Sequence, residues 1–183
     1  ADHPRALLAA HGLRAKKRLG QNFLMDGAAA TRIARLAVDA PASEDGVRAI
    51  EIGAGTGELT RALLLEGARV TALEIDPELV NILRSRDDIA AASVVQADAL
   101  AFDYAAWAGA EDWRATGNLP YNVATPLLLR LLEMRENGPQ TIVAMIQKDV
   151  AERLAARPGT AAYGSLSVAV PYAATVEKAA RDA

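Results

Sequence analysis

Short apolar runs alternate along this chain with stretches in which apolar residues recur every three or four positions. The runs have the length and composition of buried strands, and the stretches between them have the spacing of helices that bury one face. Six strands are predicted, at residues 47–52, 69–74, 93–96, 113–117, 141–146 and 166–171. This alternation predicts an α/β fold, with a mainly parallel sheet and helices on both of its faces.

Residues with boundary preferences indicate where some of the helices begin. Asp26 is predicted to cap a helix that turns Ile33, Leu36 and Ala37 toward the core. A later helix is predicted to begin near residues 125–126, because proline is favoured in the first turn of a helix.

The composition excludes several classes of protein. The 183 residues, 51% of them apolar, suffice for one domain with a sizeable core. Cysteine is absent and the only histidines are His3 and His11, so we expect no disulfide and no metal site. No segment approaches the roughly 20 apolar residues of a membrane span, and the first residues lack a signal-peptide pattern. We therefore expect a cytoplasmic protein without membrane contact.

The charge is unevenly distributed. The net charge is −3, but the first 30 residues hold five basic and two acidic residues, whereas the other 153 hold fifteen basic and twenty-one acidic ones. The basic residues nearest one another are Arg14, Lys16, Lys17 and Arg18. This cluster is either an arm that contacts RNA phosphates or an ordinary solvated tail, and charge alone favours neither.

A glycine-rich stretch lies between the first predicted strand and the helix that follows. Gly53, Gly55 and Gly57 allow the backbone to approach a ligand closely, and a helix start presents free N–H groups. Glu74 ends the next predicted strand, which in an open α/β sheet lies beside the first. A carboxylate at that position can accept both hydroxyls of a ribose. The pattern therefore predicts a site for a nucleoside-bearing cofactor.

The spacing of the glycines distinguishes between two cofactor classes. A dinucleotide-binding turn has the pattern G-x-G-x-x-G, whose last glycine would fall where this chain has Glu58. A carboxylate there would repel a pyrophosphate. The pattern Glu-x-Gly-x-Gly-x-Gly instead resembles the S-adenosylmethionine loop of class I methyltransferases, whose cofactor has no phosphate.

The tetrapeptide Asn118-Leu119-Pro120-Tyr121 follows the fourth predicted strand and so borders the same crevice. The exocyclic amine of adenine is a poor nucleophile because its lone pair is delocalised into the ring. The Asn118 amide oxygen and the Leu119 carbonyl can each accept an N–H bond of that amine, which localises the lone pair. Pro120 fixes the backbone and Tyr121 offers a stacking face for the base. An ordinary proline turn is the alternative interpretation.

Several blocks of the sequence, in matching order and spacing, resemble the KsgA family of small-subunit ribosomal RNA adenine dimethyltransferases. The blocks are residues 17–24, 51–57, 74–76, 96–99, 117–122, 147–153 and 163–168. The resemblance implies a Rossmann-like class I methyltransferase fold and S-adenosylmethionine as cofactor. The residues it assigns to that cofactor are Asn22, Leu24, Gly53, Gly55, Glu74, Asp98 and Asn118.

The resemblance also implies roles and a substrate. Asn22 and Leu24 would close over the methionine part of the cofactor, Glu74 would bind the ribose, and Asp98 would bind the adenine edge, although Asp98 alone is equally interpreted as a helix cap. The implied target is two adjacent adenosines in a hairpin loop near the 3′ end of small-subunit (16S) RNA, each dimethylated during ribosome biogenesis. The residues then expected to contact RNA are Arg14, Lys16, Lys17, Arg18, Lys148 and Arg153. A monomer is expected.

The chain differs from the family pattern after the sixth predicted strand, where the family continues into a last antiparallel strand and a small helical domain. We therefore expect residues 1–25 to form a basic arm and cofactor-closing segment, and residues 26–183 the catalytic domain. The last strand and the helical domain would be missing, which would leave the strand at 166–171 poorly paired.

Four alternatives compete with this interpretation. A large-subunit RNA adenine methyltransferase of the macrolide-resistance type shares most blocks, but residues 147–150 and 163–168 favour the small-subunit family. A DNA adenine methyltransferase usually has proline in place of Leu119. A dinucleotide-dependent oxidoreductase conflicts with Glu58. The last alternative is a non-enzymatic role, in which the protein binds RNA as a checkpoint of ribosome assembly.

Overall fold

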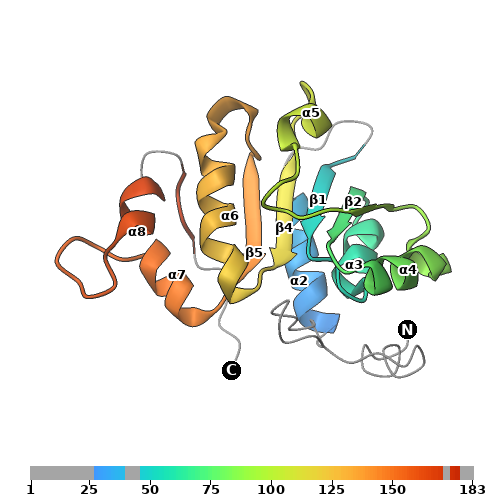
Figure 1. Ribbon diagram of the computed structural model, residues 1–183, viewed down its shortest axis with the longest axis horizontal. Helices are drawn as coiled ribbons and strands as arrows, with labels where there is room; N and C mark the ends of the chain where they lie inside the picture. The colour runs from blue at the N-terminus through green and yellow to red at the C-terminus, as the bar shows by residue number, and fades with distance from the viewer. Residues whose placement is uncertain (1–26, 40–45, 171–173, 178–183) are drawn as a thin grey trace.

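The computed structural model describes residues 27–39, 46–170 and 174–177, without the side chains of Tyr121 and Ala169 (Figure 1). The predicted arm, residues 1–25, lies outside these ranges, as does Asp26. No helix in the described part of the chain is both long enough and apolar enough to span a membrane.

Five parallel strands form one sheet in the order β3-β2-β1-β4-β5. They are β1 (Arg48–Ile52), β2 (Arg69–Glu74), β3 (Ser93–Gln96), β4 (Arg114–Asn118) and β5 (Thr141–Met145). All five lie within a residue or two of their predicted positions. The chain runs outward from β1 to β3 and then returns to the other side of β1 at β4. Such a reversal of strand order leaves a crevice at the carboxyl ends of the strands.

Helices cover both faces of the sheet, as predicted (Figure 1). One face carries α2 (Gly27–Val38), α3 (Glu58–Leu65) and α4 (Pro77–Ser85). The other face carries α5 (Tyr104–Ala108) and α6 (Tyr121–Glu133), with α7 (Lys148–Leu154) and α8 (Ser165–Ala169) packed against α6. Two short 3-10 helices, η2 (Asp87–Ile89) and η3 (Arg135–Asn137), follow α4 and α6.

Alternation along the strands divides the core between the two faces. In β1, Ala49 packs with α2 and α3, whereas Ile50 and Ile52 pack with the helices of the opposite face. The part of the core that lies beneath α5 and α6 also holds the aromatic side chains of Tyr104 and Trp113, both 1% exposed. Both aromatic side chains therefore belong to the core.

The ends of α3 and α4 follow from their boundary residues. Gly67, with φ of 85°, lets the chain leave α3 in a Schellman turn, in which the N–H of Ala68 donates to the carbonyl of Leu63 at 3.0 Å. Asp76 caps α4 through a 3.1 Å bond from the N–H of Glu78, and Pro77 occupies the first helical position. The end of α3 and the start of α4 thus lie at residues whose backbone and side-chain preferences suit those positions.

The predicted strand at 166–171 is wrong, because residues Ser165–Ala169 form helix α8. A short apolar run fits either a buried strand or one face of a helix, and packing decides between them. Here Leu166 and Val170, four residues apart, are both 3% exposed on the helix face, and α8 packs against α6 and α7.

Two further predictions differ from the structure. Helix α6 begins at Tyr121, about one turn before the predicted start, and Pro126 lies inside it on an exposed position. Leu36 was predicted to face the core but is 37% exposed. Helix α2 instead buries Ala30, Ala34 and Ala37, because only small side chains fit where it packs closely on α3.

Candidate active site

A cleft opens at the carboxyl ends of β1 to β4, where the change of strand direction predicts a ligand site. Its walls come from the turn after β1, the ends of β2 and β3, and the segment that joins β4 to α6. Among the predicted site residues that line it are Gly53, Gly55, Glu74, Asp98, Asn118 and Pro120. The fold therefore brings together residues that are up to 67 positions apart in sequence (Gly53 to Pro120).

The glycine turn has the left-handed backbone that glycine permits. Gly53, Gly55 and Gly57 have φ of 73°, 59° and 88°. The N–H groups of Gly53 and Ala54 both donate to the Leu73 carbonyl, at 2.9 and 3.0 Å, which ties the turn to β2. A Cβ on Gly53 would have one neighbour within 4 Å, the Asn118 carbonyl oxygen at 3.9 Å. It would therefore occupy space that the cleft leaves open.

Gly57 serves a different neighbour. A Cβ on Gly57 would lie 2.9 Å from Leu83 Cδ2 and 3.1 Å from Ile89 Cδ1. These side chains come from α4 and η2, behind the turn. Gly57 therefore permits close packing of α3 on its neighbours and is absent from the cleft lining.

Glu74 is 6% exposed, and its carboxylate holds the glycine turn at the end of β2. Its Oε2 accepts the N–H of Gly55 at 2.8 Å, and its Oε1 accepts the N–H groups of Ile75 and Asp76 at 2.9 and 3.0 Å. Because a carboxylate has about four acceptor positions, Oε2 retains capacity for a hydroxyl donor from the cleft.

Glu58 contributes a second carboxylate to the cleft lining, and this one is paired with a cation. Arg86 Nη1 lies 3.1 Å from Glu58 Oε1, and the two side chains are only 10% and 15% exposed. The same nitrogen donates to the Thr56 carbonyl, and Arg86 also pairs with Asp88 at 2.6 Å. The acidic residue that argued against a pyrophosphate therefore has its charge balanced, and Arg86 anchors the turn to the end of α4.

Glu51 lies beneath the turn and lines the cleft while being 2% exposed. Burial raises the pKa of Glu51 to about 8, and the nearby Glu74 carboxylate raises it too, whereas a hydrogen bond from the Thr60 hydroxyl partly opposes the shift. Glu51 is therefore largely protonated at pH 7 in the absence of a cation. Sequence analysis did not assign it a role in the site.

Asp98 lies just beyond β3 and is exposed. Its Oδ1 accepts the N–H of Leu100 at 2.9 Å, and its carbonyl accepts the N–H groups of Ala101 and Phe102 at 3.0 and 2.9 Å. These bonds close a turn, whereas the next helix, α5, is capped by Asp103. The interpretation of Asp98 as a helix cap is therefore wrong. Asp98 is a residue of the cleft lining whose carboxylate has acceptor capacity to spare.

The predicted Asn-Leu-Pro-Tyr motif joins the end of β4 to the start of α6. Asn118 is half-buried and lines the cleft together with Pro120, the N-cap of α6. The Leu119 side chain is 5% exposed in the core, and its N–H donates to the Met145 carbonyl at 2.9 Å. Burial of Leu119 and pairing to β5 fix the backbone on either side of Asn118.

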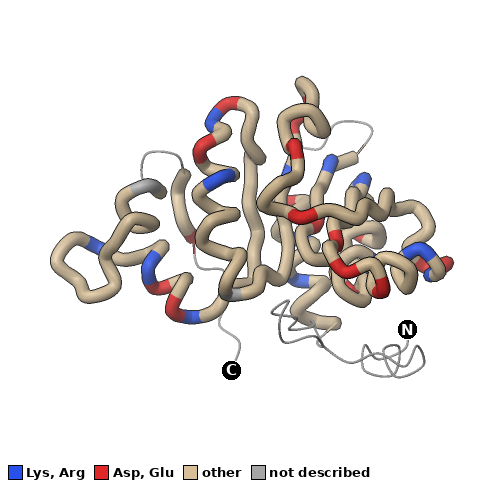
Figure 2. The backbone as a smooth tube through the Cα atoms, viewed as in Figure 1, with Lys and Arg blue, Asp and Glu red and all other residues tan. Residues whose placement is uncertain are grey.

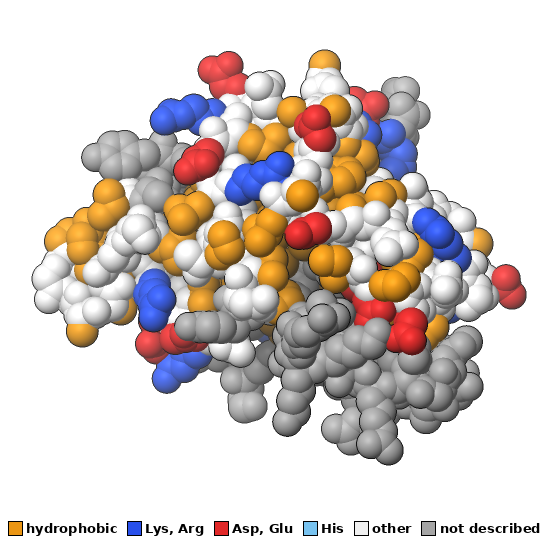
Figure 3. Space-filling model, in the orientation of Figure 1, with side chains coloured by type: hydrophobic (Ala, Val, Ile, Leu, Met, Phe, Trp, Pro, Cys, Tyr) orange, Lys and Arg blue, Asp and Glu red, His pale blue; other side chains and the backbone are white. Residues whose placement is uncertain are grey.

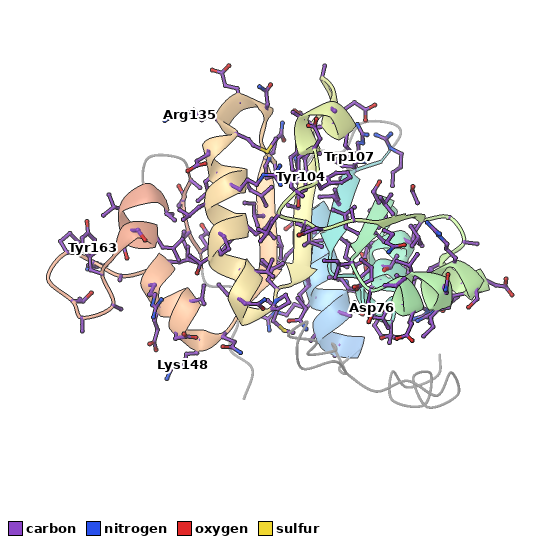
Figure 4. All side chains as sticks on the ribbon, in the orientation of Figure 1. Asp76, Tyr104, Trp107, Arg135, Lys148 and Tyr163 are labelled. Carbon is purple, nitrogen blue, oxygen red and sulfur yellow. The ribbon has the colours of Figure 1, made fainter. Side chains whose placement is uncertain are left out.

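The remaining predicted residues fall into two groups. Asn22, Leu24, Arg14, Lys16, Lys17 and Arg18 lie outside the described residues, as does the Tyr121 side chain. Lys148 and Arg153 are exposed on α7, away from the cleft lining, and Figure 4 shows Lys148 at the outer side of that helix.

The structure adds residues that sequence analysis missed. Ile75 is 47% exposed yet lines the cleft, and Ala97, Ala99 and Val123 complete its apolar wall. An apolar residue directly after the acidic end of β2 was the available signal for Ile75. In the described residues no group of three His, Cys, Asp or Glu side chains could hold a metal ion.

The model of the family described as "Ribosomal RNA adenine dimethylase" matches residues 12–180 of this chain. This chain belongs to the ribosomal RNA adenine dimethylase family. The resemblance predicted from the sequence blocks is therefore confirmed.

Curated relatives of this dimethylase-family chain include two proteins named "Ribosomal RNA small subunit methyltransferase A". The one from Myxococcus xanthus is 44% identical over 170 residues, which cover 91% of this chain and 57% of the relative. The one from Pseudomonas aeruginosa is 44% identical over 168 residues, which cover 90% and 60%. The chain thus spans less than two thirds of the length of these relatives.

Solved structures of similar fold include other RNA methyltransferases. A dimethyladenosine transferase from Plasmodium falciparum matches with a TM-score of 0.65 and 27% identity, over 82% of this chain and 52% of that one. The 23S rRNA methyltransferase ErmE matches with a TM-score of 0.57 and 31% identity, over 72% and 50%. The predicted Rossmann-like methyltransferase fold is confirmed by these matches and by the strand order.

Proposed function

We propose that this chain is the catalytic part of an enzyme that uses S-adenosylmethionine to dimethylate two adjacent adenosines near the 3′ end of small-subunit ribosomal RNA. The observation that carries the proposal is the meeting in one cleft of the glycine turn, Glu74, Asp98 and Asn118. The names of the 44% identical relatives support the small-subunit RNA as substrate. The reaction would belong to ribosome biogenesis in the cytoplasm.

The chemistry of the cleft fits this cofactor. The space beside Gly53 would admit its methionine end, the free capacity of Glu74 Oε2 suits a ribose hydroxyl, and Ile75 offers an apolar surface for a base. Asp98 presents an acceptor to the adenine edge, whose exocyclic amine is the donor there. When bound, the cofactor supplies a methyl group on a positively charged sulfur, so the methyl carbon needs no further activation.

The protein's contribution is then alignment and polarisation of the target amine. The Asn118 side-chain oxygen and the Leu119 carbonyl would each accept one N–H of that amine, which concentrates its lone pair on nitrogen. The nitrogen–carbon bond forms as the carbon–sulfur bond breaks, and the amine then loses one proton. The buried Leu119 side chain and Pro120 would keep the motif rigid during this step.

Two basic segments would bind the RNA. The first is the arm with Arg14, Lys16, Lys17 and Arg18. The second is on α7, where Lys148 pairs with Glu152 at 3.6 Å and Figure 2 shows acidic and basic positions interspersed. On the face drawn in Figure 3 the basic side chains stand apart and form no continuous surface. We therefore assign the larger electrostatic share to the arm.

The deciding experiment combines cofactor binding with methyl transfer. Calorimetry on the wild type should detect S-adenosylmethionine and no NAD. Tritiated methyl transfer should occur to undermethylated small subunits and not to large-subunit RNA. Asn118→Ala should reduce transfer about a hundred- to a thousandfold, as removal of one polar group that stabilises a transition state does, while circular dichroism shows that the fold persists.

Each alternative predicts a different outcome of this experiment. Transfer to large-subunit RNA would indicate the macrolide-resistance type of enzyme. Binding of NAD would overturn the methyltransferase proposal. Tight binding of immature small subunits without any transfer, by wild type and Asn118→Ala alike, would indicate the non-enzymatic checkpoint role.

A further inference from the structure

Arg130 lies on α6, about two turns after the cleft residue Val123, and its guanidinium reaches the segment that follows β3. Nη1 donates to the Ala99 carbonyl at 3.1 Å and Nη2 donates to the Phe102 carbonyl at 2.8 Å. The guanidinium also lies over the Tyr104 ring, 5.2 Å from its centroid. In Figure 1 the segment after β3 passes beside α6 before it enters α5.

The segment that Arg130 holds is a wall of the cleft. Residues 97–99 line it, and Asp98 stands directly before the carbonyl that Arg130 binds. The Ala99 carbonyl has a second donor, the Tyr104 hydroxyl at 2.9 Å. Two side chains therefore converge on the peptide group next to Asp98.

The surroundings of Tyr104 make this contact rigid. Its ring stacks on Trp113 at 5.7 Å and meets Phe102 edge-on at 5.1 Å, and Tyr104 is 1% exposed. Arg130 is thus set against a ring that cannot shift without disturbing the core. A planar guanidinium with two parallel donors fits this arrangement, whereas a lysine ammonium cannot reproduce both its stacking and its two bonds.

We infer that Arg130 is a positioning residue, which holds Asp98 where it accepts the adenine amine of the methyl donor. The inference rests on the proposed function. Arg130 belongs to α6, whose first residue, Tyr121, is the last residue of the Asn118 motif. Arg130 therefore connects the wall proposed to bind the donor's base with the helix next to the proposed target site. Its effect is on donor affinity, and the methyl-transfer step itself does not depend on it.

Arg48 provides a matched control at the other end of the sheet. It too donates to two carbonyls, those of Trp107 at 2.6 Å and Ala108 at 2.8 Å, and it lies 4.1 Å from the Trp107 ring centroid. Arg48 begins β1, whereas the cleft lies at the carboxyl ends of the strands. Loss of Arg48 removes an equivalent structural clamp without touching the cleft.

The test compares Arg130→Met, Arg130→Lys and Arg48→Met in the full chain. Binding is measured by calorimetry with S-adenosylhomocysteine and with the same thioether whose purine lacks the 6-amino group, and steady-state transfer gives kcat and KM. We expect Arg130→Met to raise the Kd of S-adenosylhomocysteine and the KM of the donor about tenfold. The value of kcat should be unchanged, and the Kd of the thioether without the 6-amino group should change little. Arg48→Met should lower the melting temperature and leave both Kd values, KM and kcat unchanged.

Two results of this comparison would overturn the inference, and a third would come from a double-mutant cycle. One is an equal loss of affinity for both thioethers, which would indicate general damage to the cleft. The other is the same affinity change in Arg48→Met.

If Arg130→Met does not fold, Tyr104→Phe removes only the second donor to the Ala99 carbonyl and is expected to act in the same direction. A double-mutant cycle with Asp98→Asn should be non-additive, and additivity would contradict an action through Asp98. Failure of the wild type to bind S-adenosylhomocysteine would instead refute the proposed function.

Discussion

Glu51 makes the stability of the fold depend on pH, because its side chain is buried and its pKa is raised from about 4.5 to about 8. Below pH 4.5 both the folded and the unfolded chain keep this proton. Between pH 4.5 and 8 the unfolded chain releases it and the folded chain retains it. This group therefore stabilises the fold less and less as pH rises through that window.

We predict that the free energy of unfolding falls between pH 5 and pH 8 and that Glu51→Gln reduces this fall by an amount on the order of a few kcal/mol. Urea unfolding at several pH values measures it. Glu133→Gln, at an exposed position, is the control. A Glu51→Gln profile parallel to that of the wild type would contradict the assigned cause.

Single residues of the site were predictable where the signal is local. The positions of Gly53, Glu74, Asp98 and Asn118 follow from the ends of consecutive strands, which a parallel sheet must bring to one edge. The Glu58–Arg86 pair was not predictable, because the two residues are 28 positions apart and meet only where Arg86 caps the end of α4. Glu51 was missed because its pKa depends on burial, which the motif does not reveal.

At the scale of elements, the packing of α2 on α3 is set by small side chains. Ala34 is 0% exposed on the buried face of α2, which packs on α3 and on β4 and β5, whereas Leu36 is 37% exposed. The sequence pattern favoured the larger apolar residues as the buried face, because hydrophobicity alone does not indicate how closely two helices approach. A similar ambiguity explains the wrong prediction of a strand at 166–171, because a short apolar run fits a buried strand as well as the apolar face of a helix such as α8.

We predict that Ala34→Leu destabilises the protein by about 1–3 kcal/mol, because the added atoms would have to separate two helices in contact. Ala28→Leu, at an exposed position of the same helix, should change stability by less than about 0.5 kcal/mol. Chemical denaturation of both variants measures the difference. Equal effects at the two positions would show that α2 is not closely packed at Ala34.

At the scale of the whole molecule, an acidic protein is proposed to bind a polyanion. The net charge of −3 opposes RNA, so the attraction must come from a local concentration of basic residues. The arm is the strongest candidate, since it carries four basic residues within five positions, 14–18. Its charge pattern was evident from the sequence, but its contacts depend on residues outside the described ranges.

We predict that replacing Lys16, Lys17 and Arg18 with alanine weakens RNA binding and lowers the slope of log affinity against log salt by up to about one per lost phosphate contact. Filter binding across salt concentrations gives the slope. Arg135→Ala is the control, since Arg135 lies at the end of α6 opposite the cleft (Figure 4). An unchanged slope in the triple variant would return the arm to a plain solvated tail.

The position of Gly57 affects how a loss of activity after substitution in the glycine turn should be interpreted. A methyl group there would collide with Leu83 and Ile89, whereas one at Gly53 would project into open space. Both glycines have a positive φ, but an added side chain would also meet different neighbours: the space for a ligand at Gly53, and the side chains of α4 and η2 at Gly57. A substitution that abolishes activity at Gly57 would report a misfitted scaffold, so a melting curve has to accompany every assay before the loss is attributed to the cofactor.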